Sequence, residues 1–421
     1  MFTLKNIILL CSISFSLLGI AMGLSAYLNY NQLALPNRGS SANATIGSDT
    51  LTEIDLIFVG DIMGHTPQIK SAEIKKDSIF DYKPCFQYVK SIISDCDYAI
   101  GNLELTLPGK PPYTGYPTFK SPDALAVALK DAGFDFLTTC NNHANDSRAR
   151  GVIATINTLD RLMIDHTGTF VDSTHRDSLY PFIKTVKGVK IAFLNYTYDT
   201  NGIPTQAPTI VNLIDTTQML IDINKAKREK PDVILAIMHW GLEYQLNESE
   251  EQRKYAAWLA KNGVHAIIGS HPHVVQPIKN EILDKKDSTL YKLPIVYSMG
   301  NFISNQTPAN TDGGIMVKLK INKNNITGVT TINDCSYIPV WRYIRNGANN
   351  KKTYQVIPVS TYELDNGASL SLNEINASAM KKFASNTRGR LAKNGAQEMS
   401  LTKISIKKPK IRTVTSSKTT K

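Results

Sequence analysis

The stretch "IIGSHPHVVQP", residues 267–277, joins a short apolar run to two histidines that are one residue apart. Such a run, ending in Gly269 and Ser270, is typical of a strand buried on both faces. The whole chain has only eight histidines, so placing two of them at a strand end indicates a binding role. Pro272 is expected to hold the backbone extended between His271 and His273, so that both imidazoles face the same edge of a sheet.

Short apolar runs of the same kind recur along the chain and predict six buried strands, at 54–60, 98–104, 134–140, 232–239, 264–270 and 293–300. Apolar residues at helical spacing lie between several of them, at 124–132, 152–163 and 251–261. This alternation predicts an α/β fold in which the carboxyl ends of the strands meet at one edge. Residues 313–380 alternate apolar and polar residues and are expected to add strands that complete the second sheet.

The predicted strand ends carry side chains that bind metals. Taken alone, Asp61 could be a helix or turn cap, and His239 could be a hydrogen-bonded core histidine. Their recurrence at successive strand ends favours one shared site, made from Asp61, Asn102, Glu104, Asn141, Asn142, His143, His239, His271 and His273. Imidazole, carboxylate and amide groups together suit Mn, Fe or Zn better than they suit a soft thiolate site.

The N-terminal segment predicts export. Residues 7–28 carry no charge and are long enough, at about 1.5 Å per residue, to span a bilayer core of about 30 Å. Only the basic Lys5 precedes them, so the N-terminus should stay cytoplasmic and the rest should be extracytoplasmic. Segment 1–28 is a signal anchor or transmembrane helix, or a cleaved signal, because "AMG" at 21–23 also permits cleavage. Residues 29–52 form a polar linker to a folded domain at 53–380.

The positive net charge of the chain, +11, comes from its C-terminus. Residues 381–421 contain twelve Lys and Arg residues and a single acid, Glu398, whereas the rest of the chain is balanced. This segment is predicted to be a disordered basic tail that is either simply solvated or attached to lipid headgroups, an acidic polymer or nucleic acid. No base-reading module precedes it, so nucleic acid is not expected as a partner.

Six motifs occur in a fixed order between residues 54 and 310: "FVGDIMGH", "GNLELTL", "NNHANDSRARG", "HWGLEY", "IIGSHPHVVQP" and "YSMGNFISNQ". This series resembles the CapA family of poly-γ-glutamate and capsule-synthesis proteins. The resemblance implies a calcineurin-like metallophosphatase sandwich, with two mixed β-sheets flanked by helices. It also implies a location on the outer face of the cell membrane and a partnership with a capsule-synthesis membrane complex.

The resemblance implies a role for each matching residue. The implied metal ligands are Asp61, Glu104, Asn142, His239, His271 and His273, and Glu104 stands where metallophosphatases usually have a bridging aspartate. His143 takes the place of the catalytic histidine that contacts a phosphate oxygen or protonates a leaving group. Trp240, Glu243 and Tyr244 follow His239 and either line the pocket or pack at a helix start. Glu243 and Tyr244 are expected to bind substrate, whereas packing is favoured for Trp240. Arg148 is either an anion-binding residue or an exposed arginine at a helix start.

The sequence also departs from the family pattern. Met63 occupies the place of a metal-binding histidine, so the site is expected to hold either one or two divalent ions. His65 could substitute for the missing histidine, although a turn role is favoured. Asn305 stands where the family tends to have an aspartate.

Three functions fit these observations. The favoured one is a component that acts in synthesis, export or attachment of an anionic capsule polymer such as poly-γ-glutamate, through a metal site. The second is a free-standing extracytoplasmic metal-dependent phosphoesterase or hydrolase that acts on a phosphorylated envelope substrate. The third is a non-catalytic binding module. The sequence leaves open whether the protein is an enzyme.

Overall fold

The computed structural model describes residues 50–76, 78–284, 290–346, 351–365, 370 and 372–399. The predicted segment 1–28, nearly all of the predicted linker and the C-terminal residues 400–421 lie outside this part of the chain. No helix in the described part combines the length and apolar character needed to cross a bilayer.

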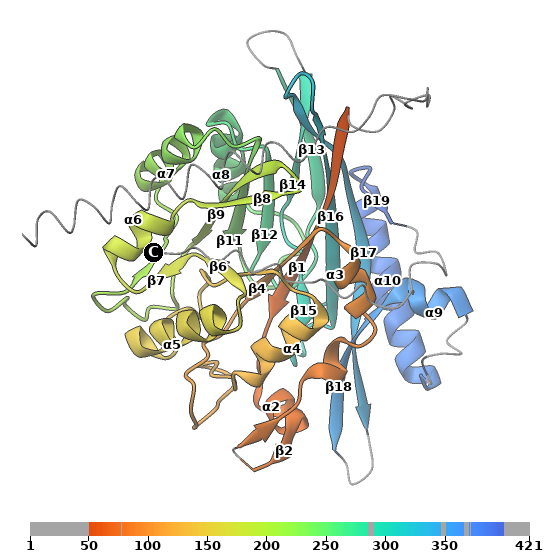
Figure 1. Cartoon of the computed structure of the whole chain (residues 1–421). Coiled ribbons are helices and arrows are strands. Elements are labelled where there is room, and N and C mark those ends of the chain that lie inside the picture. The colour runs from red at the N-terminus through yellow and green to blue at the C-terminus, as the bar shows by residue number, and fades with distance from the viewer. Residues whose placement is uncertain are drawn as a thin grey trace, which may run out of the picture. The chain divides into compact units, whose positions relative to one another are not determined.

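The larger of two main sheets is built around the long first strand (Figure 1). Its strands are β1 (Leu51–Ile62), β4 (Tyr98–Leu103), β5 (Phe136–Thr138), β6 (Asp165–Thr167), β15 (Asn301–Ile303), β16 (Gly313–Asn324), β17 (Thr330–Asn346), β18 (Lys352–Pro358) and β19 (Gln397–Glu398). The main order is β18-β17-β16-β1-β4-β5-β6, with β15 beside β1 and β19 beside β17. Strands β1, β4, β5 and β6 are parallel neighbours, and β16 is antiparallel to β1.

The smaller sheet has the order β13-β14-β12-β11-β9-β8. Its strands are β8 (Phe182–Val186), β9 (Val189–Thr197), β11 (Val233–His239), β12 (Ala266–Ser270), β13 (Ile278–Asp284) and β14 (Leu290–Val296). Strands β9, β11, β12 and β14 are parallel. The remaining strands form two separate two-stranded sheets. One pairs β2 (Glu73–Lys75) with β3 (Ile79–Phe80), and the other pairs β7 (Thr169–Phe170) with β10 (Ile210–Val211). Each of the six predicted apolar runs overlaps a strand of one of the two main sheets.

The two sheets share an apolar layer. Leu56 and Phe58 of β1 lie in one buried cluster with Phe193 and Leu235 of the smaller sheet. The alternate residue Ile57 lies in a different cluster, on the opposite face of the larger sheet. Because β1 is buried on both faces, its sequence is a nearly continuous apolar run. The predicted α/β sandwich of two mixed sheets is confirmed.

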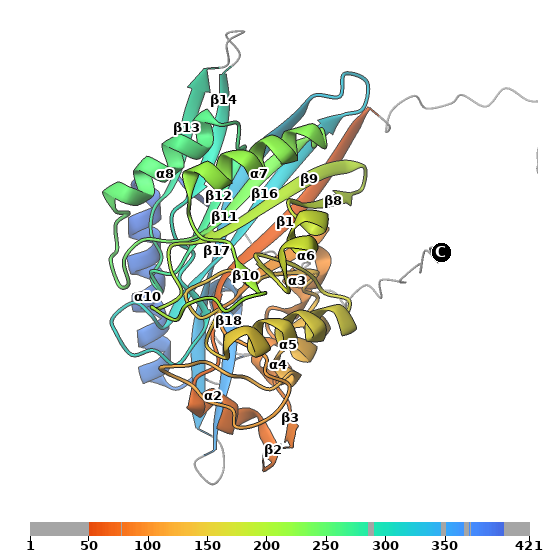
Figure 2. The same ribbon diagram turned by 90° about the vertical axis from the view of Figure 1, so that its left-hand side faces the viewer.

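Helices cover the outer faces of both sheets (Figure 2). The larger sheet is covered by α2 (Thr66–Ala72), the 3₁₀ helix η1 (Lys83–Phe86), α3 (Lys90–Asp95), α4 (Ala124–Ala132) and α5 (Arg148–Arg161). The smaller sheet is covered by α7 (Thr216–Arg228) and α8 (Glu250–Lys261), and the short α6 (Ser173–Leu179), which has no buried residue, contacts β7. Beyond β18, α9 (Val359–Asp365) and α10 (Glu374–Ala392) pack against β17. The helices predicted at 124–132, 152–163 and 251–261 correspond to α4, α5 and α8.

The prediction for residues 313–380 is wrong about which sheet these strands join. Strand β16 pairs with β1 along Leu51–Val59, and β17 and β18 follow it antiparallel. They therefore widen the larger sheet and do not complete the smaller one. Alternation in the sequence shows that a strand has one buried face, but it does not select the pairing partner.

The predicted boundary of the basic tail is also wrong, because residue 381 lies inside α10. The buried side chains of this helix, Met380, Phe383, Ala384, Thr387 and Leu391, follow helical spacing. Lys381 and Lys382 are exposed, so the first two charges of the predicted tail lie on the solvent face of an amphipathic helix. After the helix, β19 pairs with β17, and the folded domain extends to residue 399.

Candidate metal centre

The carboxyl ends of four strands meet at one buried site. Strand β1 places Asp61, and Glu104 directly follows its neighbour β4. In the smaller sheet, His239 ends β11, and the residue after β12 is His271. All six predicted ligands, which also include Asn142 and His273, are at most 2% exposed. Residues that are distant in sequence therefore meet at the carboxyl edge, as expected for parallel strands.

Glu104 lies at the centre of this group. Its Oε1 atom is 3.7 Å from Nε2 of His239 and 3.7 Å from Nε2 of His273. Two sets of three side chains bring potential ligand atoms within 4.8 Å of one another: Glu104 with His271 and His273, and Asp61 with Glu104 and His239. Because Glu104 belongs to both sets, the arrangement accommodates one ion or two.

Three buried atoms of this group have no hydrogen-bond partner among the described residues: both carboxylate oxygens of Glu104 and Nδ1 of His271. Burial raises the pKa of Glu104 well above its usual value, and the nearby Asp61 raises it further. A buried carboxylate without a partner is costly. A divalent cation would supply the missing partner, so these residues fit a metal.

Neighbouring side chains orient the potential ligands. Asn102 donates from Nδ2 to Oδ1 of Asp61 at 2.8 Å, and Oδ2 of Asp61 lies 3.0 Å from Nδ1 of His273. The same Nδ1 lies 3.1 Å from Oδ1 of Asn301. Because both neighbours are acceptors, Nδ1 of His273 carries the hydrogen, and Nε2 is left to bind a metal. Burial raises the pKa of Asp61, but its hydrogen bonds with His273 and Asn102, together with its electrostatic interactions with His273 and His271, lower it overall.

His239 is held between two asparagines. Its Nε2 atom lies 2.8 Å from Oδ1 of Asn142, and its Nδ1 lies 3.3 Å from Nδ2 of Asn102. Asn142 donates in turn to Oδ1 of Asn201 at 3.2 Å, which directs its own Oδ1 toward His239. Burial, together with the nearby His271, lowers the pKa of His239 well below its usual value. The imidazole is therefore neutral, as a metal ligand requires.

The loop that carries the histidine pair is not extended, contrary to the prediction based on Pro272. His271 has φ 100° and His273 has φ 60°, which are uncommon values for residues other than glycine. Such a conformation costs about 1–3 kcal/mol for each residue, so the surrounding contacts must hold it. One of these contacts joins the backbone N–H of Tyr244 to the carbonyl of Pro272 at 2.8 Å. The turned backbone places the His271 ring 4.8 Å from that of His239 and 5.9 Å from that of His273.

His143 lies beside the ligand group but pairs with a carboxylate. Its Nδ1 atom is 2.7 Å from Oδ2 of Asp146, and both side chains are buried. The backbone N–H of Phe119 donates to the same carboxylate oxygen. Asp146 was not singled out from the sequence, although a carboxylate three residues after a histidine could have indicated the pair. This arrangement is suited to holding or moving a proton at Nε2 of His143.

Three side chains lie at the exposed mouth of the group. The Glu243 side chain is 42% exposed, and its Oε1 lies 3.9 Å from Nε2 of His273. The ring of Tyr244 is 6.1 Å from that of His273, and the ring of Tyr198 is 4.5 Å from that of His271. Tyr198 directly follows β9, which no predicted strand included. Both tyrosines are partly exposed, so all three side chains can reach a bound substrate.

Other residues singled out in the sequence lie elsewhere. Arg148 is exposed at the start of α5, and no contact among the described residues joins it to the ligand group. Met63 is buried in the apolar cluster of the larger sheet, so it provides no ligand. His65 precedes α2 and accepts a hydrogen bond at Nδ1 from the backbone of Asn305, which confirms its turn role. Trp240 is buried and donates to the carbonyl of Tyr297, which is a packing role.

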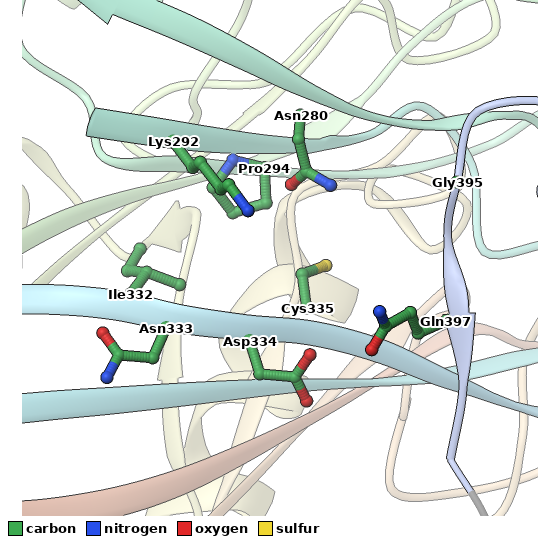
Figure 3. Close-up of a pocket in the computed structure, with 9 residues that line it drawn as sticks. All are labelled: Asn280, Lys292, Pro294, Ile332, Asn333, Asp334, Cys335, Gly395 and Gln397. Carbon is green, nitrogen blue, oxygen red and sulfur yellow. The ribbon is translucent and has the colours of Figure 1, made fainter. Parts of the chain in front are cut away.

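A separate cavity of about 140 Å³ lies between the edge of the smaller sheet and β17 (Figure 3). Lys292 of β14 lines one wall, and Asp334 and Cys335 of β17 line another. None of the potential metal ligands lines it. This cavity therefore takes no part in the candidate site.

Comparison with known protein families decides the classification. The model of the family described as "Bacterial capsule synthesis protein PGA_cap" matches residues 55–306, which include all the potential metal ligands. The chain belongs to this family. The predicted resemblance to CapA proteins is therefore confirmed.

Two curated relatives of this PGA_cap chain are CapA proteins. The PGA biosynthesis protein CapA of Bacillus subtilis (strain 168) is 29% identical over 279 residues, which are 63% of this chain and 67% of that protein. The capsule biosynthesis protein CapA of Bacillus anthracis is 28% identical over 283 residues, which are 65% of each protein. The matches thus span about two thirds of the length of each relative.

Solved structures similar to this PGA_cap chain include two bacterial proteins. Haemophilus influenzae NAD nucleotidase (NadN) has a TM-score of 0.45 and 12% identity, and the match covers 80% of this chain and 63% of that one. The calcineurin-like phosphoesterase YfkN from Bacillus subtilis has a TM-score of 0.42 and 14% identity, with coverage of 80% and 98%.

Proposed function

We propose that this protein acts in the synthesis, export or attachment of an anionic capsule polymer, such as poly-γ-glutamate, through a divalent metal site. Membership of the PGA_cap family and the names of the two CapA relatives support the polymer. The proposal of a metal rests mainly on Glu104. This residue is fully buried among three histidines and Asp61, and both of its carboxylate oxygens lack a hydrogen-bond partner in the described chain.

The residues that would hold the metal are Asp61, Glu104, Asn142, His239, His271 and His273. Their nitrogen and oxygen atoms suit Mn, Fe or Zn. When bound, a divalent cation would supply Lewis acidity toward an acyl or phosphoryl oxygen and would make a water molecule more acidic.

The remaining residues of the site would act on the substrate directly. His143 would hold or give a proton at Nε2, while Asp146 keeps the hydrogen on Nδ1 and fixes the orientation of the ring. At the mouth, Glu243 would position an amine or hydroxyl group, and Tyr244 would donate a hydrogen bond to an oxyanion. Burial of the metal ligands would keep bulk water away from the reacting groups.

A second function, metal-dependent hydrolysis of a phosphorylated envelope substrate, is favoured by one observation. The buried His143–Asp146 pair is the arrangement expected for general acid catalysis, which a protein that only binds a polymer does not need. An assay of the metal-loaded chain separates the two functions. Conversion of a phosphodiester would support hydrolysis, whereas binding of the polymer without changing it would support the polymer function.

The proposed polymer function is tested by binding. The full chain, purified in mild detergent, is expected to bind labelled poly-γ-glutamate more tightly with Mn²⁺ or Zn²⁺ than with a chelator, as measured by fluorescence anisotropy. His239→Ala, compared at the same free metal concentration, should lose this metal-dependent part, because it removes a ligand. Equal binding by both proteins under both conditions would exclude a role of the metal site in handling the polymer.

We further propose that the protein is held in the cell membrane by residues 1–28, with its folded domain outside the cytoplasm. The apolar stretch and the single basic residue before it support this orientation. A reporter enzyme that works only outside the cytoplasm should be active when fused after Thr52. Activity from a reporter restricted to the cytoplasm at the same junction would contradict the proposal.

A further inference from the structure

A second cavity, of about 570 Å³, lies where the loop after β15 meets β17, β18 and α10. Three cationic side chains line it, one from each of these last three elements: Arg342, Lys352 and Lys382. One carboxylate, that of Asp312, lines it as well. The charged groups of the wall therefore carry an excess of positive charge.

Arg342 is the cation that most needs a partner. Its Nε atom is buried and has no hydrogen-bond partner in the described part of the chain, and the guanidinium forms no salt bridge there. Asp312 attracts the guanidinium electrostatically but forms no ion pair with it within 4.0 Å, and its Oδ2 accepts from the indole of Trp341 at 2.9 Å. A planar guanidinium without a partner, facing a cavity, is suited to binding an anion.

The segment of residues 301–312, which consists of β15 and the loop after it, joins this cavity to the candidate metal centre. The Oδ1 atom of Asn301 lies 3.1 Å from Nδ1 of His273. The Nδ2 atom of the same asparagine donates to Oε1 of Gln306 at 2.8 Å. Gln306 lines the cavity. The neighbouring Asn305 also lines it, and its backbone donates to His65. One asparagine therefore contacts both a potential metal ligand and a residue of the cavity wall.

We propose that this cavity is an anion subsite that binds a carboxylate of a polyanionic chain while a neighbouring unit of the same chain occupies the metal centre. The identity of the chain as a polycarboxylate rests on the proposed function. The subsite itself rests on the guanidinium that forms no ion pair, on the two lysines and on the segment 301–312 that it shares with the metal centre. A polymer with one carboxylate in every repeat suits two adjacent sites of this kind, whereas a small neutral substrate would leave the cations without partners.

The test compares two adjacent lysines of α10 in the full chain. Lys382 lines the cavity, while Lys381 lies outside it with its Nζ 5.5 Å from the centre of the Tyr362 ring. Lys382→Gln should weaken binding of labelled poly-γ-glutamate severalfold at fixed ionic strength, and adding Lys352→Gln should bring the loss to about tenfold or more, because two hydrogen bonds to a charged group are then lost. Lys381→Gln removes the same charge from the same helix and should change binding less than about twofold. Arg342→Lys keeps the charge without the planar donor and should give an intermediate loss.

The outcomes distinguish the subsite from the metal site. Equal weakening by the Lys381 and Lys382 variants would overturn the proposal, because it would show general attraction to a basic surface. The effect of the Lys352/Lys382 pair should persist in a His271→Ala/His273→Ala background, so a failure of the metal hypothesis leaves this test intact. Free glutarate should compete with the polymer more strongly than inorganic phosphate does. The reverse order would overturn the assignment to carboxylate.

Discussion

Replacing His271 and His273 together with alanine is expected to remove the metal from the protein. The two imidazoles belong to one of the two sets of potential ligands around Glu104, and His273 is fixed for metal binding by Asp61 and Asn301. Loss of outer contacts alone typically weakens metal affinity about 10–100-fold, so loss of two ligands should exceed about 100-fold. Mass spectrometry of metal content, with a competitive chelator titration, measures this directly. Asp61→Asn should weaken binding as well, because an amide lacks the charge that attracts a dication.

The control must separate ligand loss from relaxation of the strained loop. Asparagine adopts a left-handed backbone more readily than alanine does, so His271→Asn/His273→Asn should lose the metal while better preserving the fold. His175→Ala, which removes a histidine from α6, should keep the metal. Thermal melts show whether each variant is folded. A folded wild-type protein that takes up no Mn, Fe or Zn under any loading condition would leave the ligand group as part of the packing and favour the non-catalytic binding module.

Replacing His143 with alanine is expected to lower catalytic turnover by about 10²–10⁴-fold while the metal content stays at the wild-type level. The reason is that His143 pairs with Asp146 and belongs to neither set of potential ligands. Turnover is measured with a chromogenic phosphodiester and with labelled poly-γ-glutamate, whose length is followed by size-exclusion chromatography. Loss of metal in this variant would reassign His143 as a ligand.

Asp146→Asn tests whether the pair acts as a unit. The amide can still accept from Nδ1 of His143 but lacks the carboxylate charge that strengthens this hydrogen bond, so the ring is held less firmly and turnover should fall. His175→Ala again serves as the histidine control and should leave turnover unchanged. If the metal-loaded wild type converts neither substrate, the catalytic interpretation of this pair is wrong, and the polymer-binding role would be the one to pursue.

The sequence by itself determined which residue types gather at the strand ends. Continuous apolar runs mark β1, β4, β11 and β12 because a parallel strand is buried on both faces, and this requirement is visible in a few consecutive residues. The rule that parallel strands share a carboxyl edge groups Asp61 with Glu104 in one sheet and His239 with His271 in the other, and the packing of the two sheets brings these pairs together. The family motifs were equally local, and the family comparison confirmed them.

The tertiary structure decided everything that depends on a partner distant in the chain. It assigned β16, β17 and β18 to the sheet of β1, and it buried one face of α10 where the charge pattern had suggested a tail. It turned the backbone at His271 and His273 in spite of Pro272, because contacts from Asp61 and Tyr244 hold the loop. It also placed Arg342 beside a cavity without a partner. Pairing, loop conformation and the partners of buried polar groups depend on energies summed over the whole fold, and a short window of sequence does not contain them.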